Sequence, residues 1–203
     1  MILETIKGGE LFYHIRKCKK FSIMTSRLFF KQLASAILHL NNQGYCHRDL
    51  KPWNIMVSSD LKSLKIIDFG YATPIKLDQL QECSKFLRER LSCTANYMAP
   101  ELYLKHVTKS LAKCDVFALG VILINFLTGD YPFHSVYDLN ETIDSIYDSF
   151  MKDPSSFLKD YADDKELIDL IKGMLHFKDE DRLSIQDVLD HQWTNSEIIS
   201  TPN

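Results

Sequence analysis

Cysteine is scarce in this sequence and shows no structural pattern. Five cysteines occur among 203 residues, an odd number without paired short spacing. Small disulfide-stabilised domains and zinc sites both depend on such pairs. The sequence therefore argues against both classes, and it predicts reduced thiols in a protein of the cytoplasm or the nucleus.

Strong charge and long apolar runs are also missing. The net charge of −3 at pH 7 gives no electrostatic attraction to nucleic acid or to an anionic membrane. The longest apolar run, residues 116–127, is too short to span a bilayer and contains Asn125. Glu4, Lys7 and Glu10 interrupt any apolar start of the kind that a signal peptide has. We predict neither nucleic-acid nor membrane partners.

The pattern that is present is mainly helical. Phe30, Leu33, Ile37 and Leu40 repeat at the three- and four-residue spacing of an amphipathic helix, which Thr25 or Ser26 would cap. Short strands are expected at residues 55–57 and 64–67, and residues 71–96 read as a functional or mobile loop. Further helices are predicted at residues 10–18, from 98, and at 116–127, 138–151, 164–175 and 184–191.

The stretch that carries chemistry is residues 47–54, which read His-Arg-Asp-Leu-Lys-Pro-Trp-Asn. Pro52 restricts the backbone at and before its own position, so this stretch reads as a loop. Asp49, Lys51 and Asn54 supply a carboxylate, an ammonium group and an amide within six residues, and Asp68 follows a second apolar run. A carboxylate for an attacking hydroxyl, a cation for a moving phosphoryl group and oxygens for magnesium indicate phosphoryl transfer.

With these motifs the chain resembles the eukaryotic protein kinases, and specifically their larger C-terminal lobe. Lys51, two places after Asp49, and Thr94, upstream of Glu101, are typical of the serine/threonine class. The residues around Glu10 and Trp193 look most like the calcium/calmodulin-dependent and related kinases. The motifs that carry the resemblance are residues 8–12 (Gly-Gly-Glu-Leu-Phe), 47–54, 68–70 (Asp-Phe-Gly), 99–101 (Ala-Pro-Glu), Asp115 with Gly120, and Asp181-Arg182.

The resemblance implies a role for each catalytic residue. Asp49 would orient the substrate hydroxyl and accept its proton, and Lys51 would balance charge on the γ-phosphate of ATP. Asn54 and Asp68 would hold Mg²⁺ through hard oxygen ligands. Thr94 would lie near Asp49 and help to hold the acceptor hydroxyl of a protein serine or threonine.

The resemblance also implies a nucleotide site at the start of the chain. Glu4 and Ile6 would offer backbone groups to the adenine, with Leu3 at the gatekeeper position. Met56 would form the floor of the pocket. Glu10 would reach either the ribose or a basic side chain of the substrate.

Four further residues would be structural by the same resemblance. His47 would be a core histidine, not a proton carrier. Asp115 would bind the backbone of the catalytic loop from the start of a buried helix. Glu101 and Arg182 would form a buried ion pair.

The 203 residues also depart from the family. They contain no glycine-rich phosphate loop, strand lysine or helix glutamate, and Gly8-Gly9 lacks the loop's spacing. The expected fold is therefore mainly α, a helical C-lobe with short β-hairpins at the catalytic loop and no N-terminal β-lobe. Residues 1–193 would form this partial kinase domain, and residues 194–203 a polar tail. The predicted function is ATP- and Mg²⁺-dependent transfer to serine or threonine of proteins, with little activity from these residues alone; the alternative is an inactive kinase-like scaffold.

Two smaller departures concern substrate and regulation. Trp53 stands where basophilic relatives often carry glutamate, which argues against the preference for basic substrates that Glu10 suggests. Arg90 lies where many relatives carry an activating phosphothreonine, so Arg48 would face a like charge there.

Overall fold

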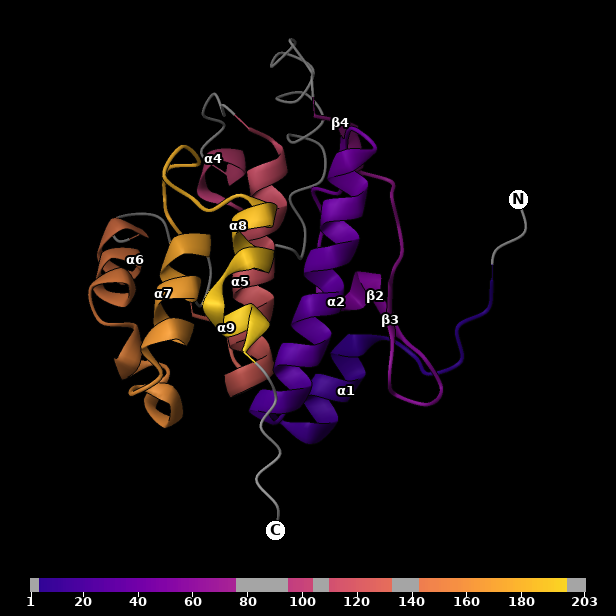
Figure 1. Ribbon diagram of the computed structural model, residues 1–203, viewed down its shortest axis with the longest axis horizontal. Helices are drawn as coiled ribbons and strands as arrows, with labels where there is room; N and C mark the ends of the chain where they lie inside the picture. Colours follow the sequence, from indigo (N-terminus) through magenta and orange to yellow (C-terminus); the bar gives the residue numbers. More distant parts are fainter. Residues whose placement is uncertain (1–3, 76–94, 104–109, 133–142, 197–203) are drawn as a thin grey trace.

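The structure is a computed structural model and describes residues 4–75, 95–103, 110–132 and 143–196. Two long helices lie at its centre, α2 (Ile23–Asn42) and α5 (Ala112–Thr128), which pack against each other (Figure 1). Short strands lie on the far side of α2, and α7 (Lys165–Met174) covers the far side of α5, while the two last short helices pack against α2. Mainly helical architecture with small β-hairpins, as the sequence predicted, is confirmed.

Helix α2 buries one apolar face and has a defined cap at each end. The Ser22 hydroxyl accepts a hydrogen bond from the Thr25 N–H at 3.1 Å, so the predicted caps Thr25 and Ser26 were wrong by three or four residues. Thr25 and Ser26 lie inside the helix instead. Ser22 is the cap because it stands just before the first turn, where its side-chain oxygen can reach N–H groups that have no partner within the helix. Gly44 follows the helix at φ +84°, as expected for a left-handed stop.

Helix α5 is buried on every side. Residues 114–127 are all buried, which is the environment expected for a helix that is apolar all round. α2 contacts one flank and α7 (Lys165–Met174) the other. α5 ends at Gly129, whose φ is +77° and whose N–H donates to the Asn125 carbonyl. None of the helices in the described ranges is long and apolar enough to cross a membrane.

Gly129 is expected to be a sensitive position for stability. A Cβ there would lie 1.8 Å from the backbone oxygen of Lys19, in the turn that follows α1 (Leu11–Cys18). Gly44 is a matched control, because it has a similar φ but nothing within 4 Å of its Cβ position. We expect Gly44→Ala to cost about 1–2 kcal/mol from conformation alone and Gly129→Ala clearly more. Urea unfolding of both variants checks this, and equal costs would contradict the close approach.

Two antiparallel strand pairs frame the segment between residues 45 and 75. β2 (Ile55–Val57) pairs with β3 (Leu64–Ile66), and β1 (Tyr45–Cys46) pairs with β4 (Thr73–Pro74). Gln32 of α2 holds the first hairpin: its amide donates to the Lys62 carbonyl and accepts from the Leu64 N–H, both at 2.9 Å. The catalytic loop leaves β1 and enters β2 through η1 (Pro52–Asn54), so both of its ends are fixed.

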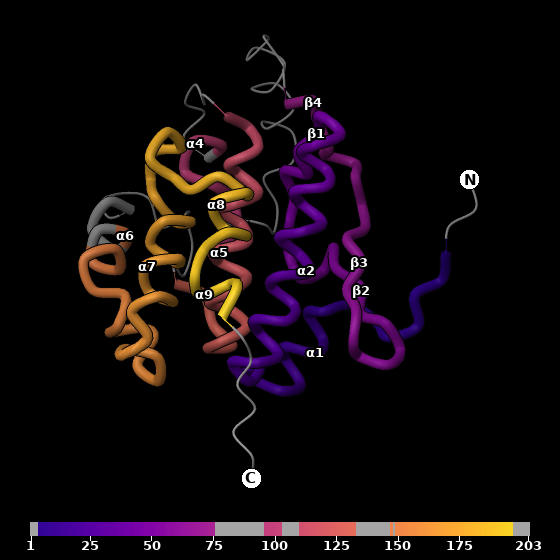
Figure 2. Tube along the Cα trace, viewed as in Figure 1, coloured from indigo at the N-terminus to yellow at the C-terminus, as the bar shows by residue number. Residues whose placement is uncertain are grey.

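The C-terminal part is a layer of shorter helices. The Asp164 side chain caps α7, and Ser184 and Asp187 form a capping box at the start of α8 (Ile185–Asp190). The predicted domain boundary at residue 193 falls within α9 (Gln192–Asn195), where Trp193 and Thr194 are buried. The remaining elements are η2 (Ala95–Tyr97), α4 (Pro100–Tyr103), α6 (Ile143–Lys152), η3 (Pro154–Ser156) and η4 (Lys159–Tyr161). Figure 2 shows α6 and α7 as neighbours beyond α5.

Candidate active site

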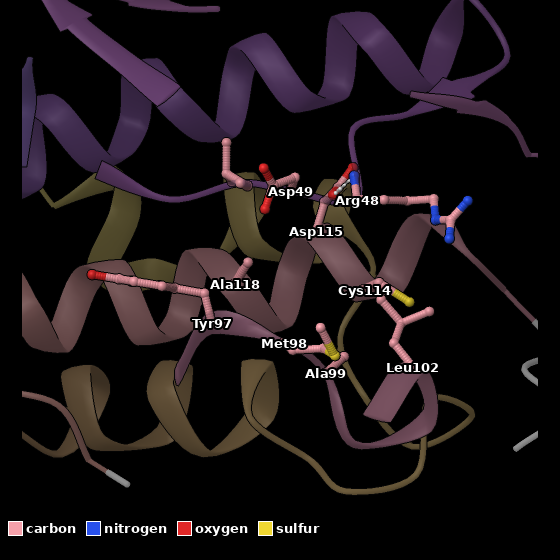
Figure 3. A pocket seen from close by; sticks show the side chains of 10 residues that line it. Arg48, Asp49, Tyr97, Met98, Ala99, Leu102, Cys114, Asp115 and Ala118 are labelled. Carbon is pink, nitrogen blue, oxygen red and sulfur yellow. Dashed lines mark hydrogen bonds between the residues drawn. The ribbon is translucent and has the colours of Figure 1, made fainter. Parts of the chain in front are cut away.

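The catalytic loop is anchored to the buried helix α5 by one carboxylate. Asp115 accepts a hydrogen bond from the backbone N–H of His47 at 2.6 Å. It accepts another from the backbone N–H of Arg48 at 2.7 Å (Figure 3). Burial raises the pKa of the Asp115 carboxyl, and these two N–H donors act against that rise. Arg48 has φ +67°, an uncommon value for a residue with a side chain. The predicted contact between Asp115 and the loop is confirmed. It holds Arg48, the residue just before Asp49, in a left-handed backbone conformation.

His47 is a buried structural histidine. Its Nδ1 accepts the Asp49 N–H at 3.3 Å, so the ring proton belongs on Nε2, which lies 3.2 Å from the Ile67 carbonyl. The Phe69 ring meets the imidazole edge to face, with the ring centres 5.2 Å apart. One ring nitrogen thus contacts the loop's own backbone and the other joins the loop to the segment after β3, which agrees with the predicted structural role of His47.

Asp49, Lys51 and Asn54 meet in a compact polar cluster. The Lys51 ammonium lies 3.1 Å from Oδ1 and 2.8 Å from Oδ2 of Asp49. The Asn54 amide nitrogen donates to both the Asp49 carboxylate and the Asp49 carbonyl, each at 2.9 Å. η1 makes this possible, since its tight turn brings Asn54 back over Asp49. The structure therefore brings together the three loop residues that the sequence singled out, with the carboxylate held by two donors.

The two magnesium candidates arise from adjacent backbone. The Ile67 N–H donates to the Asn54 carbonyl at 2.9 Å, and Asp68 follows directly. Asp68 is exposed, has φ +59°, and accepts the Gly70 N–H at 3.1 Å. Because the Asn54 amide nitrogen is occupied by Asp49, its side-chain oxygen is the atom left to face a cation.

This donor set fits Mg²⁺. The described residues hold no cluster of three or more His, Cys, Asp or Glu side chains that could bind a metal by themselves. Mg²⁺ takes one or two protein oxygens and completes its shell with water and substrate phosphates. One amide oxygen and one carboxylate are therefore enough.

The predicted nucleotide side is only partly described. Glu10 forms a backbone bridge to Met56, and the Val57 N–H donates to the Gly9 carbonyl at 2.8 Å. The segment before α1 thus lies along β2 and places Glu10 beside Met56. Ile6 is half-buried and Glu4 pairs with Lys65 on the surface. Leu3 and Thr94 lie outside the described residues.

The predicted buried ion pair is present. Arg182 meets Glu101 in bidentate geometry, with Nη1 2.7 Å from Oε1 and Nη2 2.9 Å from Oε2. The guanidinium also donates to the carbonyls of His176, Lys113 and Phe177. Burial raises the pKa of the Cys114 thiol, which therefore stays neutral and donates to Glu101. The pair fastens α4 to the loop before α8.

Two contacts were not predicted from the sequence. Arg48 donates from Nη1 to the Thr73 hydroxyl at 2.8 Å, which links the loop to β4. Phe12 of α1 stacks on Trp53, with ring centres 4.1 Å apart and an angle of 22°. An aromatic residue inside a catalytic motif was the only sequence signal for the stacking.

A small cavity separates the loop from α4 and α5; Arg48, Tyr97 and Cys114 are among its lining residues (Figure 3).

A polar loop held by a buried carboxylate, with an aspartate, lysine and asparagine in contact, is an arrangement suited to phosphoryl transfer. Comparison with known proteins agrees with it. A family model described as the protein kinase domain matches residues 1–194. The chain belongs to the protein kinase family.

Curated relatives carry the same assignment. The chain is 35% identical over 205 residues to a serine/threonine-protein kinase of Drosophila persimilis, covering 98% of the chain and 25% of the relative. A serine/threonine-protein kinase of Drosophila melanogaster is 34% identical over 199 residues, covering 96% and 25%. A putative ribosomal protein S6 kinase alpha-2 of Caenorhabditis elegans is 33% identical over 210 residues, covering 97% and 26%. The chain thus spans about a quarter of the length of these relatives, all three of which are named as kinases.

Proposed function

We propose that this chain carries the acceptor side of an ATP- and Mg²⁺-dependent protein serine/threonine kinase. The observation that supports it best is the Asp49 carboxylate, held at 2.8–3.1 Å by the Lys51 ammonium and the Asn54 amide. A carboxylate fixed in this way is ready to orient a hydroxyl, and positioning is most of what phosphoryl transfer needs from the protein.

The proposed reaction transfers the γ-phosphoryl group of ATP to a serine or threonine hydroxyl. A bond forms between the hydroxyl oxygen and the γ-phosphorus, and the bond from that phosphorus to the β–γ bridging oxygen breaks. Asp49 orients the hydroxyl and takes its proton. Lys51 is shared between Asp49 and the incoming γ-phosphate, whose charge it balances.

The remaining site residues join this proposal in the roles that the family resemblance implies. Asn54 and Asp68 hold Mg²⁺, which supplies charge neutralisation on the phosphates when bound. Glu4 and Ile6 offer backbone groups to the adenine, with Leu3 at the gatekeeper position, and Met56 forms the floor of the pocket. Glu10 reaches either the ribose or a basic side chain of the substrate, and Thr94 helps to hold the acceptor hydroxyl. The position of Glu10 beside Met56 on β2 supports a shared nucleotide floor.

We further propose that residues 1–193 correspond to the hinge and C-lobe of the kinase fold, in a form most like the calcium/calmodulin-dependent and related kinases. Gly8-Gly9 does not substitute for a glycine-rich phosphate loop. A Cβ on Gly8 would lie 2.1 Å from the Val57 carbonyl oxygen, so this backbone is pressed against β2. Within the part of the chain that the structure describes, Gly8-Gly9 therefore cannot cover the phosphates of a nucleotide.

Purified residues 1–203 are consequently expected to transfer little or no phosphate, because positioning of the nucleotide supplies several kcal/mol of catalysis. Radiolabel transfer from γ-labelled ATP to a protein substrate measures this, with Asp49→Asn in the same chain as the background. Turnover well above that background would contradict the expected loss of activity in residues 1–203, and it would support the proposed phosphoryl transfer.

The alternative is a kinase-like scaffold that binds partners without catalysis. Mg²⁺-ATP separates the two, because a ligand that binds only the folded state raises the melting temperature. If Mg²⁺-ATP raises the melting temperature and the double substitution Asn54→Ala with Asp68→Ala abolishes that rise, the kinase is supported. If Mg²⁺-ATP leaves the melting temperature unchanged in every natural form of the protein that contains these residues, the scaffold is supported.

A further inference from the structure

The outer edge of β3 is covered by a side chain and not by another strand. Among the residues that the structure describes, β3 pairs with β2 alone, so its other edge lacks a strand partner. The side-chain amide of Gln32 on α2 fills this place. Its nitrogen donates to the Lys62 carbonyl and its oxygen accepts from the Leu64 N–H, both at 2.9 Å. A primary amide offers both a donor and an acceptor, which is what an open strand edge needs.

The opposite edge of the hairpin is held as well. The Val57 N–H of β2 donates to the Gly9 carbonyl at 2.8 Å, which attaches β2 to the segment before α1. At the turn, the Ser58 N–H donates to the Ser63 carbonyl at 2.9 Å and closes the hairpin on itself. The hairpin is therefore attached on each edge, and Gln32 supplies the attachment to α2.

The hairpin carries both magnesium candidates at its open end. Asn54 directly precedes β2, and Asp68 follows β3 after a single residue. In an antiparallel pair the start of one strand lies beside the end of the other, and here the Ile67 N–H donates to the Asn54 carbonyl at 2.9 Å. Asp68 is exposed and has φ +59°, a backbone value that persists only where the surrounding structure imposes it. The placement of both side chains therefore depends on the placement of the hairpin.

We propose that Gln32 is a positioning residue for the magnesium site, because it fixes β3 against α2 and so keeps Asp68 where it can share an ion with Asn54. This rests on the proposed function, since Asn54 and Asp68 must be the ligands. Mg²⁺ demands near-ideal octahedral geometry, so a displaced hairpin binds it less well. α2 packs against α5, whose Asp115 anchors the catalytic loop. Gln32 thus ties the metal ligands to the same pair of helices that holds the loop of Asp49.

Mn²⁺ tests the positioning role without relying on catalysis, because it also prefers carboxylate, carbonyl and water ligands and is detected by electron paramagnetic resonance. Its dissociation constant is measured with saturating ADP in the longest natural form of the protein that contains residues 1–203. Gln32→Met keeps the length of the side chain but makes neither hydrogen bond. It should weaken Mn²⁺ binding about threefold to tenfold, less than the roughly 10–100-fold typical of partners that touch a metal ligand directly.

Two further measurements separate positioning from a general structural role. ADP affinity in the presence of EDTA should stay unchanged in Gln32→Met, since the nucleotide without metal does not depend on Asp68. Amide hydrogen exchange at Ile67 should become faster, because the hairpin has lost its attachment to α2. Gln32→Ala should give the same three results and replaces Gln32→Met if that variant fails to fold.

Lys31→Met is the matched control. Lys31 is the neighbouring residue on α2, and its ammonium also ties the helix to a distant element by donating to the Asn195 side chain of α9 at 3.0 Å. The control should leave Mn²⁺ and ADP binding unchanged. Wild-type Mn²⁺ affinity in both folded Gln32 variants would overturn the proposal. An equal loss of metal-free ADP binding in them, or the same loss of Mn²⁺ affinity in Lys31→Met, would also overturn it.

The ligands themselves are tested in the same assay. If Asn54→Ala and Asp68→Ala both keep the Mn²⁺ affinity of the wild type, the magnesium site of the proposed function is wrong, and the role of Gln32 falls with it. If these two variants lose Mn²⁺ affinity while both folded Gln32 variants retain it, only the role of Gln32 is removed.

Discussion

Asp49→Asn is expected to lower the rate of phosphoryl transfer about 10²–10⁴-fold, the usual contribution of a positioned general base. Asparagine has almost the same shape and still offers an oxygen to the Asn54 amide. It cannot take the hydroxyl proton, and it leaves the Lys51 ammonium without the charge that lies 2.8 Å away. The rate is measured in the longest natural form of the protein that contains residues 1–203 and transfers phosphate.

Asp60→Asn is the matched control. Asp60 is also held by a short polar turn, where it accepts hydrogen bonds from Ser58 and Lys62, but it lies on the exposed β2–β3 connection. Its substitution should leave the rate unchanged, and both variants should melt close to the wild type. A rate within a factor of a few of wild type in Asp49→Asn would remove Asp49 from its assigned role.

Arg182→Met is expected to have the largest effect on stability, about 3–5 kcal/mol, because it leaves the Glu101 carboxylate buried without its partner. Arg182 is 2% exposed and Glu101 is 6% exposed, so water cannot replace the lost contacts. Three backbone carbonyls lose a donor as well. For a domain of this size the melting temperature should fall by roughly 6–20 °C.

Two further variants distinguish a buried charge from lost packing. The double variant Glu101→Leu with Arg182→Met removes both charges and should recover more than half of the loss, since apolar replacements of buried pairs are often tolerated. Lys20→Met breaks the exposed pair with Asp160 and should leave the melting temperature unchanged. If Arg182→Met melts like the wild type, the pair does not hold α4 in place.

The catalytic loop could be predicted from sequence because its chemistry is local. Asp49, Lys51 and Asn54 lie within six residues, and Pro52 restricts the backbone between them, so few conformations keep them apart. Contacts with distant partners needed more than spacing. Asp115 and the Glu101–Arg182 pair were predicted only through the family resemblance, since nothing in their own neighbourhoods names the partner.

Other features depend on packing that no local pattern encodes. The Ser22 cap was missed because three polar residues precede the apolar stripe of α2, and only the entry of the chain beside Phe126 selects the first of them. The pairing of β1 with β4 joins two-residue strands on either side of the catalytic segment, which is too short a pattern to recognise. The stacking of Phe12 on Trp53 brings α1 against η1, and the sequence showed only that a large aromatic side chain stands beside Asn54.

The central claim is that the cluster around Asp49 transfers phosphate to serine or threonine. Phosphoamino-acid analysis of a protein substrate, labelled with γ-³²P-ATP and Mg²⁺ by the longest natural form containing these residues, tests it most directly. We predict label in phosphoserine or phosphothreonine that disappears in Asp49→Asn. Label in phosphotyrosine, or the same label with Asp49→Asn, would contradict the claim.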